Sequence, residues 1–269
     1  MSSQHLFSTF HTKKINVFFD ESGKIGQRPN LLGAISIPQK IYQCEDIQKL
    51  NQLLKEEQIK IHWNKYNGFI PYKKNITDLI NTFSKYRDYI KLNIINYHHG
   101  FLNSQQLFQK EHREHTIYSK FPERIIYGLI RGYGSETAVE ADIFIDKATE
   151  YERIGLKETI LNTLNAHSLY RGEKFVAKDC FLYPKNTEIG LELIDVLLGL
   201  MRIIILNTSP QELSKAENAK VSLTIELLEN EALKNLLSEV KYYEWRGHNQ
   251  LTRIDFIDYI YSFLIQHKY

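Results

Sequence analysis

The alternation of apolar and polar positions predicts a chain that opens with a strand hairpin. Residues 15–19 are an apolar, aromatic run that stops at Asp20 and Glu21 before a serine and a glycine. This pattern is typical of a buried strand that delivers carboxylates to the edge of a sheet. Residues 30–38 are apolar between turn-forming residues, so we expect a second strand, paired antiparallel with the first.

Beyond the hairpin, the period of the apolar positions alternates between that of a helix and that of a strand. Helical spacing predicts helices over residues 41–56, 75–86, 104–133 (in two pieces), 153–168, from 187 onward, and from 210 and 252 onward. Two-residue alternation or a short apolar run predicts strands at residues 59–63, 90–97, 141–146 and 179–183. This order favours a mixed α/β main domain over residues 14–208, followed by a helical C-terminal extension over residues 209–269. The extension belongs either to the same domain or to a separate element.

Three aspartates occupy positions that suggest a site. The strand at 141–146 repeats the opening pattern and ends at Asp146, so two such strands side by side would bring Asp20 and Asp146 within reach of one cation. Asp195 lies in the apolar run 191–201 of a predicted helix. An unpaired, ionised carboxylate there would be costly, so Asp195 must be protonated, paired or bound to a metal.

Carboxylates from separate elements suit Mg²⁺ or Mn²⁺, which prefer oxygen ligands. Two such ions stabilise the attacking and leaving oxygens of a phosphodiester, so we expect a hydrolase that cleaves nucleic acid by water attack. Glu21 or His62 would complete the catalytic set, with His62 as a proton shuttle. Glu188 and Glu192 precede Asp195 at helical spacing and are candidate outer ligands. The competing interpretation is a set of buried caps and ion pairs.

Three segments resemble the DUF3800 family, which is similar to a branch of the RNase H-like nucleases. They read FFDESG at 18–23, IFID at 143–146 and LIDVLLG at 193–199, and the resemblance covers roughly residues 14–206. It implies a central five-stranded sheet of order 3-2-1-4-5 flanked by helices, and metal-dependent phosphodiester cleavage. It also implies that Asp20, Asp146 and Asp195 hold the metal.

Basic and aromatic residues are candidates for contact with a DNA or RNA substrate. Lys60 precedes His62 by two positions, and Lys147 directly follows Asp146, where it would meet a phosphate. Residues 241–248 interleave basic and aromatic side chains as single-strand binding surfaces do. The candidates in this segment are Lys241, Tyr243, Trp245 and Arg246. The same side chains would equally serve to pack the C-terminal segment against the main domain.

Two other functions remain open. The segment 111–115 reads EHREH, and His98 is followed by His99; histidines at such spacing bind transition metals. The segment matches neither HExxH nor HxxEH, which leaves a His-based metal hydrolase or a solvated helix face. The other alternative is a non-catalytic module that keeps the fold and binds nucleic acid or protein.

Composition adds limits rather than a function. With 269 residues, of which 43% are hydrophobic and 25% charged, the chain is globular. A net charge of +2 means that contact with nucleic acid must come from local basic patches.

Cys44 and Cys180 are too few for a disulfide framework and lack metal-ligand spacing. The N-terminus lacks a secretory signal pattern, and the apolar run 191–206 is too short and too charged to span a bilayer easily. We therefore expect a cytoplasmic protein without a membrane partner, acting alone, as a homodimer or with a partner protein.

Overall fold

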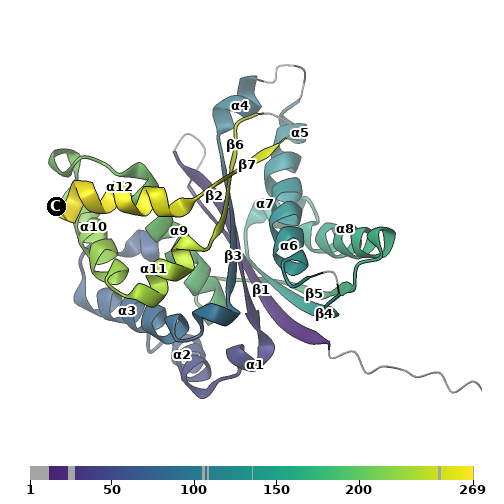
Figure 1. Ribbon diagram of the computed structural model, residues 1–269, viewed down its shortest axis with the longest axis horizontal. Helices are drawn as coiled ribbons and strands as arrows, with labels where there is room; N and C mark the ends of the chain where they lie inside the picture. The colour runs from purple at the N-terminus through teal and green to yellow at the C-terminus, as the bar shows by residue number, and fades with distance from the viewer. Residues whose placement is uncertain are drawn as a thin grey trace, which may run out of the picture.

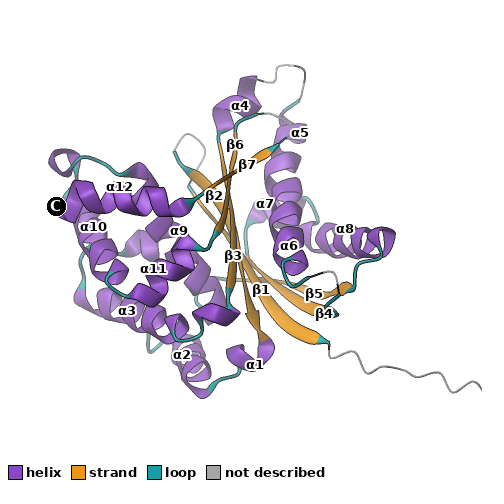
Figure 2. Cartoon of the chain, in the orientation of Figure 1, coloured by secondary structure: helices purple, strands orange, loops and turns teal. Residues whose placement is uncertain are grey.

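The computed structural model describes residues 12–23, 28–104, 107, 109–134, 136–247 and 250–268. In these ranges seven strands form one mixed sheet that separates two groups of helices (Figures 1 and 2). The strands are β1 (Lys13–Ser22), β2 (Asn30–Pro38), β3 (Lys91–Tyr97), β4 (Val139–Asp146), β5 (Phe175–Tyr183), β6 (Lys241–Trp245) and β7 (Leu251–Ile254).

The sheet has the order β5-β4-β1-β2-β3-β6-β7. Strand β2 runs antiparallel to both of its neighbours, while β4 is parallel to β1 and to β5, and β6 is parallel to β3. The C-terminal ends of β1, β3, β4, β5 and β6 therefore meet at one edge of the sheet, where β2 begins. We call this edge the carboxyl edge.

The α/β class is confirmed, but the prediction of a five-stranded sheet with a helical extension is wrong. Strands β1 to β5 follow the relative order 3-2-1-4-5, and β6 and β7 extend the sheet beyond β3. These two strands come from the segment predicted to be helical. Residues 241–245 alternate between the two faces of the sheet and include two tyrosines and a tryptophan, residues that fit a half-buried strand well.

The predicted strand at residues 59–63 is also wrong. The structure has an irregular segment there, followed by the 3-10 turn η1 (Trp63–Lys65). The backbone N–H of Trp63 donates to Asp195 Oδ2 at 3.1 Å. Trp63 itself is buried against Gly199, where any side chain would overlap the indole ring. The segment is thus held by a helix rather than by a neighbouring strand.

Helices cover both faces of the sheet (Figure 1). One face carries α1 (Gln39–Tyr42), α2 (Glu45–Lys55), α3 (Ile70–Ser84), η2 (Arg87–Tyr89), α9 (Ile189–Leu206), η4 (Pro210–Glu212), α10 (Lys215–Leu228), α11 (Glu231–Ser238) and α12 (Phe256–Lys268). The other face carries α4 (His99–Ser104), α5 (Lys110–His115), the π-helical turn η3 (Thr116–Lys120), α6 (Phe121–Arg131), α7 (Thr149–Arg153) and α8 (Leu156–Arg171). None of the helices in the described ranges has the length and apolar character needed to cross a membrane.

Each face of the sheet has its own apolar core, and β1 contributes to both. Phe18 packs into the core under α9, which also takes in side chains of α10 to α12, such as Leu223 and Phe263. Val17 and Phe19 pack into the core under α6 and α8. Because successive strand residues point to opposite faces, the residue after Phe19 is directed toward α9.

Candidate active site

Three aspartates meet beside the carboxyl edge. Asp20 and Asp146 lie in adjacent parallel strands, near the end of β1 and at the end of β4, where Phe19 pairs with Ile145. Asp195 lies on α9, which packs on the same face of the sheet that Asp20 points to. Asp20 and Asp195 are both buried. Two strand ends and one covering helix thus deliver three carboxylates to one place.

The carboxylates meet on the ammonium group of Lys185. Its Nζ lies 2.8 Å from Asp20 Oδ2, 3.1 Å from Asp146 Oδ2 and 3.6 Å from Asp195 Oδ1. The expected convergence of the three aspartates is therefore confirmed. Their role as metal ligands stays a prediction, because the group that they share in this structure is an amine.

Lys185 was not singled out from the sequence. It follows the Tyr183 end of β5 by two residues, inside a stretch that the sequence shows only as a Pro-Lys-Asn turn. The signal that could have found it is positional: β5 lies next to β4 and ends at the same edge of the sheet, so a charged residue just after it lies near Asp146.

Burial and mutual repulsion raise the pKa values of two of the acids. Burial raises the pKa of Asp20 well above its usual range; the Lys185 charge opposes this effect, while Asp195 and Asp146 add to it. Burial likewise raises the pKa of Asp146 against the opposing effect of Lys185. For Lys185, burial lowers the pKa, but the three carboxylates outweigh burial and raise it. The ammonium is therefore charged at all ordinary pH values.

Asp195 behaves differently from the other two aspartates. Burial raises its pKa, but contact with His62, the charge of Lys185 and the Trp63 N–H together lower it below its usual value. His62 Nδ1 lies 3.5 Å from Asp195 Oδ2, which is long for a strong hydrogen bond. The structure thus brings His62 beside the three aspartates, as the sequence suggested.

Glu192, which lies one turn before Asp195 on α9, helps to hold the turn that carries Lys185. It is completely buried, and its Oε1 accepts the backbone N–H of Asn186 at 2.6 Å. This bond ties the turn that carries Lys185 to the helix that carries Asp195. Its Oε2 and the Oδ1 of Asp146 are buried without a hydrogen-bond partner among the described residues.

The buried carboxyl of Glu192 predicts a pH-dependent loss of stability. Burial raises its pKa from 4.5 to about 7, so the folded state binds the proton more tightly than the unfolded chain does. Between about pH 4.5 and pH 7, stability therefore falls as pH rises, by roughly 3 kcal/mol from this group. Chemical unfolding of the wild type and of Glu192→Gln over this range measures the effect. We expect a clearly shallower decline in the variant; parallel curves would contradict the assignment.

The structure does not bring Glu21 or Glu188 into the group. Glu21 points to the opposite face of the sheet, where its Oε2 accepts the hydroxyl of Tyr151 at 3.0 Å. Burial raises the pKa of Glu21. Glu188 accepts the Tyr42 hydroxyl at 2.7 Å and pairs with Lys55 at 2.7 Å, so it belongs to a contact between α9 and α2.

The basic candidates are dispersed. Lys60 is exposed and lies 3.9 Å from Glu57, and Lys147 pairs with Glu152 at 3.0 Å. Lys241 begins β6 at the edge opposite the carboxyl edge. These lysines do not surround the three aspartates.

The rest of the basic and aromatic segment is divided between the faces of β6. Tyr243 packs against the core under α6, and the Trp245 ring meets Phe121 edge-on at 5.4 Å. Arg246 pairs with Glu244 at 2.6 Å. Packing thus accounts for most of this segment, and only Trp245 and Arg246 lie at the carboxyl edge. Position 248 is outside the described residues.

The histidine-rich segments form no competing centre in the structure. In α5, Glu114 pairs with Arg153 at 2.6 Å on the surface. Across the described ranges, no group of three or more His, Cys, Asp or Glu side chains is arranged to hold a metal ion. Asp20, Asp146 and Asp195 do not form such a group either; in this structure they meet on the Lys185 ammonium.

Comparison with known proteins identified no relative of this chain. No family model, no curated protein and no solved structure matches the chain. The assignment of the candidate site therefore depends on the geometry of its residues alone.

Proposed function

We propose that the protein is a metal-dependent nuclease with an RNase H-like fold, related to the DUF3800 family, that hydrolyses phosphodiester bonds of nucleic acid. The observation that carries the proposal is the meeting of Asp20, Asp146 and Asp195 on one cationic group at the carboxyl edge. The arrangement of β1 to β5 supports the choice of fold, since an antiparallel β1-β2-β3 unit is followed by β4 and β5 parallel to β1.

The donor set fits Mg²⁺ or Mn²⁺. These ions prefer carboxylate oxygens, and three carboxylates around one ammonium leave a local excess of negative charge. Asp146 Oδ1 has no hydrogen-bond partner among the described residues, so it is free to act as a ligand. Asp20, Asp146 and Asp195 would hold the ion after the partly exposed Lys185 side chain withdraws toward solvent.

The residues of the chain then have distinct tasks. A metal ion held by Asp20, Asp146 and Asp195 would polarise the phosphodiester and lower the pKa of a water molecule. Lys185 contacts all three carboxylates, so its charge would lie close to a phosphate held there and would offset negative charge that develops on it. His62, beside Asp195, is placed to transfer a proton, as histidine commonly does.

A cleavage assay tests the proposal. The purified protein is incubated with labelled single- and double-stranded DNA and RNA, in Mn²⁺, in Mg²⁺ or in EDTA. We expect cleavage of at least one substrate with a metal ion, none in EDTA, and none by Asp146→Asn under any condition. Absence of cleavage on all four substrates, or equal cleavage in EDTA, would refute the nuclease.

One observation favours a second candidate, a non-catalytic module that binds nucleic acid or protein. The Lys185 ammonium already contacts all three carboxylates, so the cluster is partly neutralised without a metal ion. Such a module would bind no Mn²⁺ at this place. Titration of the protein with Mn²⁺, followed by calorimetry, separates the two candidates.

A further inference from the structure

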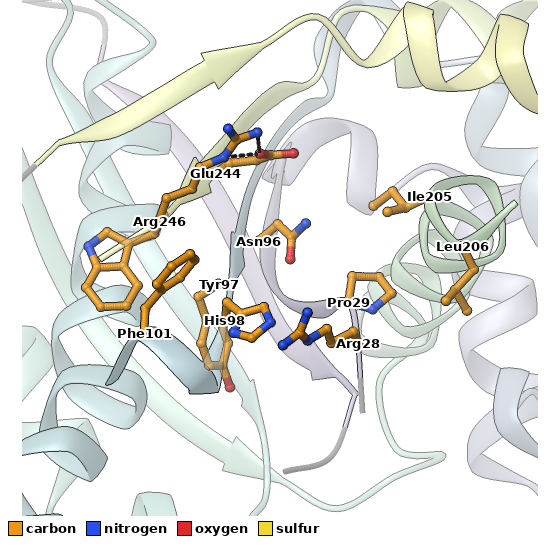
Figure 3. Close-up of a pocket in the computed structure, with 11 residues that line it drawn as sticks. Arg28, Pro29, Asn96, Tyr97, His98, Phe101, Ile205, Leu206, Glu244 and Arg246 are labelled. Carbon is orange, nitrogen blue, oxygen red and sulfur yellow. Dashed lines mark hydrogen bonds and ion pairs between the residues drawn. The ribbon is translucent and has the colours of Figure 1, made fainter. Parts of the chain in front are cut away.

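A pocket of about 520 Å³ opens at the same edge of the sheet as the three aspartates. Its base is formed by Asn96 and Tyr97 at the end of β3. Figure 3 shows Phe101 of α4 on one side and Ile205 and Leu206 of α9 on the other. The pocket therefore bridges the two groups of helices across the end of the sheet.

Two arginines provide positive charge in this pocket. Arg28 precedes β2, is exposed, and has no ion pair among the described contacts; Figure 3 shows its guanidinium beside the ring of His98. Arg246 follows β6 and donates through Nε and Nη2 to Glu244, which uses two of its five N–H donors. Glu244 is the acidic residue of the lining, and it also accepts the hydroxyl of Tyr259 at 2.7 Å. The remaining donors of two guanidiniums therefore suit a phosphate.

The other lining groups suit a flat, apolar ligand. Phe101 is more than a third exposed, and its ring centroid lies 5.1 Å from that of His98. Phe101 also packs against Gly247, and a side chain at position 247 would crowd the Phe101 ring. Phe101 is thus held in place while part of its surface stays exposed, and partly exposed aromatic side chains are the platforms on which nucleic-acid bases stack. Pro29, Ile205 and Leu206 complete an apolar wall.

The pocket lies close enough to the three aspartates for one single-stranded nucleic acid to reach both. From β1, which carries Asp20, to β6, which ends at Trp245, there are three strand spacings, about 14 Å in all. Along α9, Ile205 lies ten residues after Asp195, about 15 Å. Both routes place the pocket a few nucleotides away from the aspartates along the carboxyl edge.

We propose that this pocket, with Phe101 as the stacking platform and Arg28 and Arg246 as phosphate contacts, holds one nucleotide of a single-stranded nucleic acid whose neighbouring segment reaches the three aspartates. The proposal rests on the nuclease function for the role of the aspartates. A paired base in a duplex has no free face to lay on Phe101, so single strands are the expected substrate. DNA and RNA share the base and phosphate chemistry that the pocket recognises.

Binding measurements in EDTA test the pocket separately from cleavage. Fluorescence anisotropy of short labelled oligothymidine and oligouridine is recorded over a range of salt concentrations. We expect Phe101→Ala to weaken binding about tenfold or more, the effect of losing one stacked base, with little change in salt dependence. Arg28→Gln and Arg246→Gln are expected to reduce the slope of log K against log salt by about 0.7 each, the value for one phosphate on a single strand. The oligonucleotide that responds identifies the substrate as DNA or RNA.

Matched controls lie at the opposite edge of the sheet. Tyr170 and Arg171, at the end of α8, are both exposed, so Tyr170→Ala and Arg171→Gln remove the same chemistry away from the pocket and are expected to bind as the wild type does. Phe101→Leu keeps an apolar side chain and guards against loss of packing; it is expected to bind as weakly as Phe101→Ala. Arg246→Lys keeps the charge and is expected to keep the salt slope.

The outcomes separate the two proposals. Pocket variants that bind like the wild type, in a protein that cleaves with Mn²⁺, would overturn the pocket and leave the nuclease intact. Weakened binding in the pocket variants of a protein that cleaves nothing would support the pocket and reject the nuclease. Equal losses in the α8 controls would show non-specific charge binding and would overturn the pocket.

Discussion

Replacing Lys185 with methionine is expected to lower the free energy of unfolding by about 3–5 kcal/mol at neutral pH, the usual cost of removing one partner from a buried ion cluster. The ammonium contacts three carboxylates, and methionine leaves them to repel one another. The deficit should shrink as pH falls, because Asp20 and Asp146, whose pKa values are raised, then take up protons. Denaturant unfolding at several pH values measures both effects.

The same variant reports on metal binding. Without the ammonium, Mn²⁺ has no competitor for the three carboxylates, so millimolar Mn²⁺ should raise the melting temperature of Lys185→Met far more than that of the wild type. The matched control is Lys147→Met, because Lys147 pairs with the exposed Glu152, an interaction worth about 0–1 kcal/mol. A Lys185→Met protein as stable as this control would contradict the ion cluster. The absence of a Mn²⁺ response in both the variant and the wild type would favour the non-catalytic module.

Asp20→Asn is expected to reduce cleavage at least about a hundredfold, the scale of losing one group that stabilises transition-state charge, without lowering stability. Burial raises the pKa of Asp20, so its ionised form opposes folding at neutral pH. The amide removes that charge, and Lys185 keeps Asp146 and Asp195 as partners. Turnover and melting temperature, measured on the same preparation, should therefore diverge.

The control for this variant lies on β4. Asp142 precedes Asp146 by four residues, so its side chain points to the same face, but it accepts a hydrogen bond from Gln39 at 2.8 Å and is not among the acids that contact Lys185. Asp142→Asn should cleave at the wild-type rate. Full activity in Asp20→Asn would remove Asp20 from the reaction, and a joint fall of activity and melting temperature would mark a structural role instead.

The parts of the fold that the sequence predicted are those set by local periodicity. The aspartates that end β1 and β4 were recognisable because an apolar run stops at a carboxylate in each. Asp195 was recognisable because a charge inside an apolar helix requires a partner. Glu21, a candidate for the catalytic set, faces away from Asp20 because successive strand residues point to opposite faces of the sheet.

The errors arose where a long-range contact overrides the local pattern. Residues 59–63 alternate like a strand, but Trp63 is held by Asp195 and Gly199 of α9. Strand β6 lies in a segment dominated by helices and exists through its pairing with β3. Such contacts join residues more than a hundred positions apart, and no window of sequence contains both partners.

The sequence by itself determined which residues end buried strands and which carboxylate needs a partner, because these follow from the two-residue and 3.6-residue periods of the backbone. Only the tertiary structure decided that the partner is Lys185, since the adjacency of β4 and β5 places the turn after β5 beside the aspartates. It also decided that Arg28, Phe101 and Arg246 share one pocket. Those residues come from three distant segments, which meet because parallel strand ends collect at one edge of the sheet.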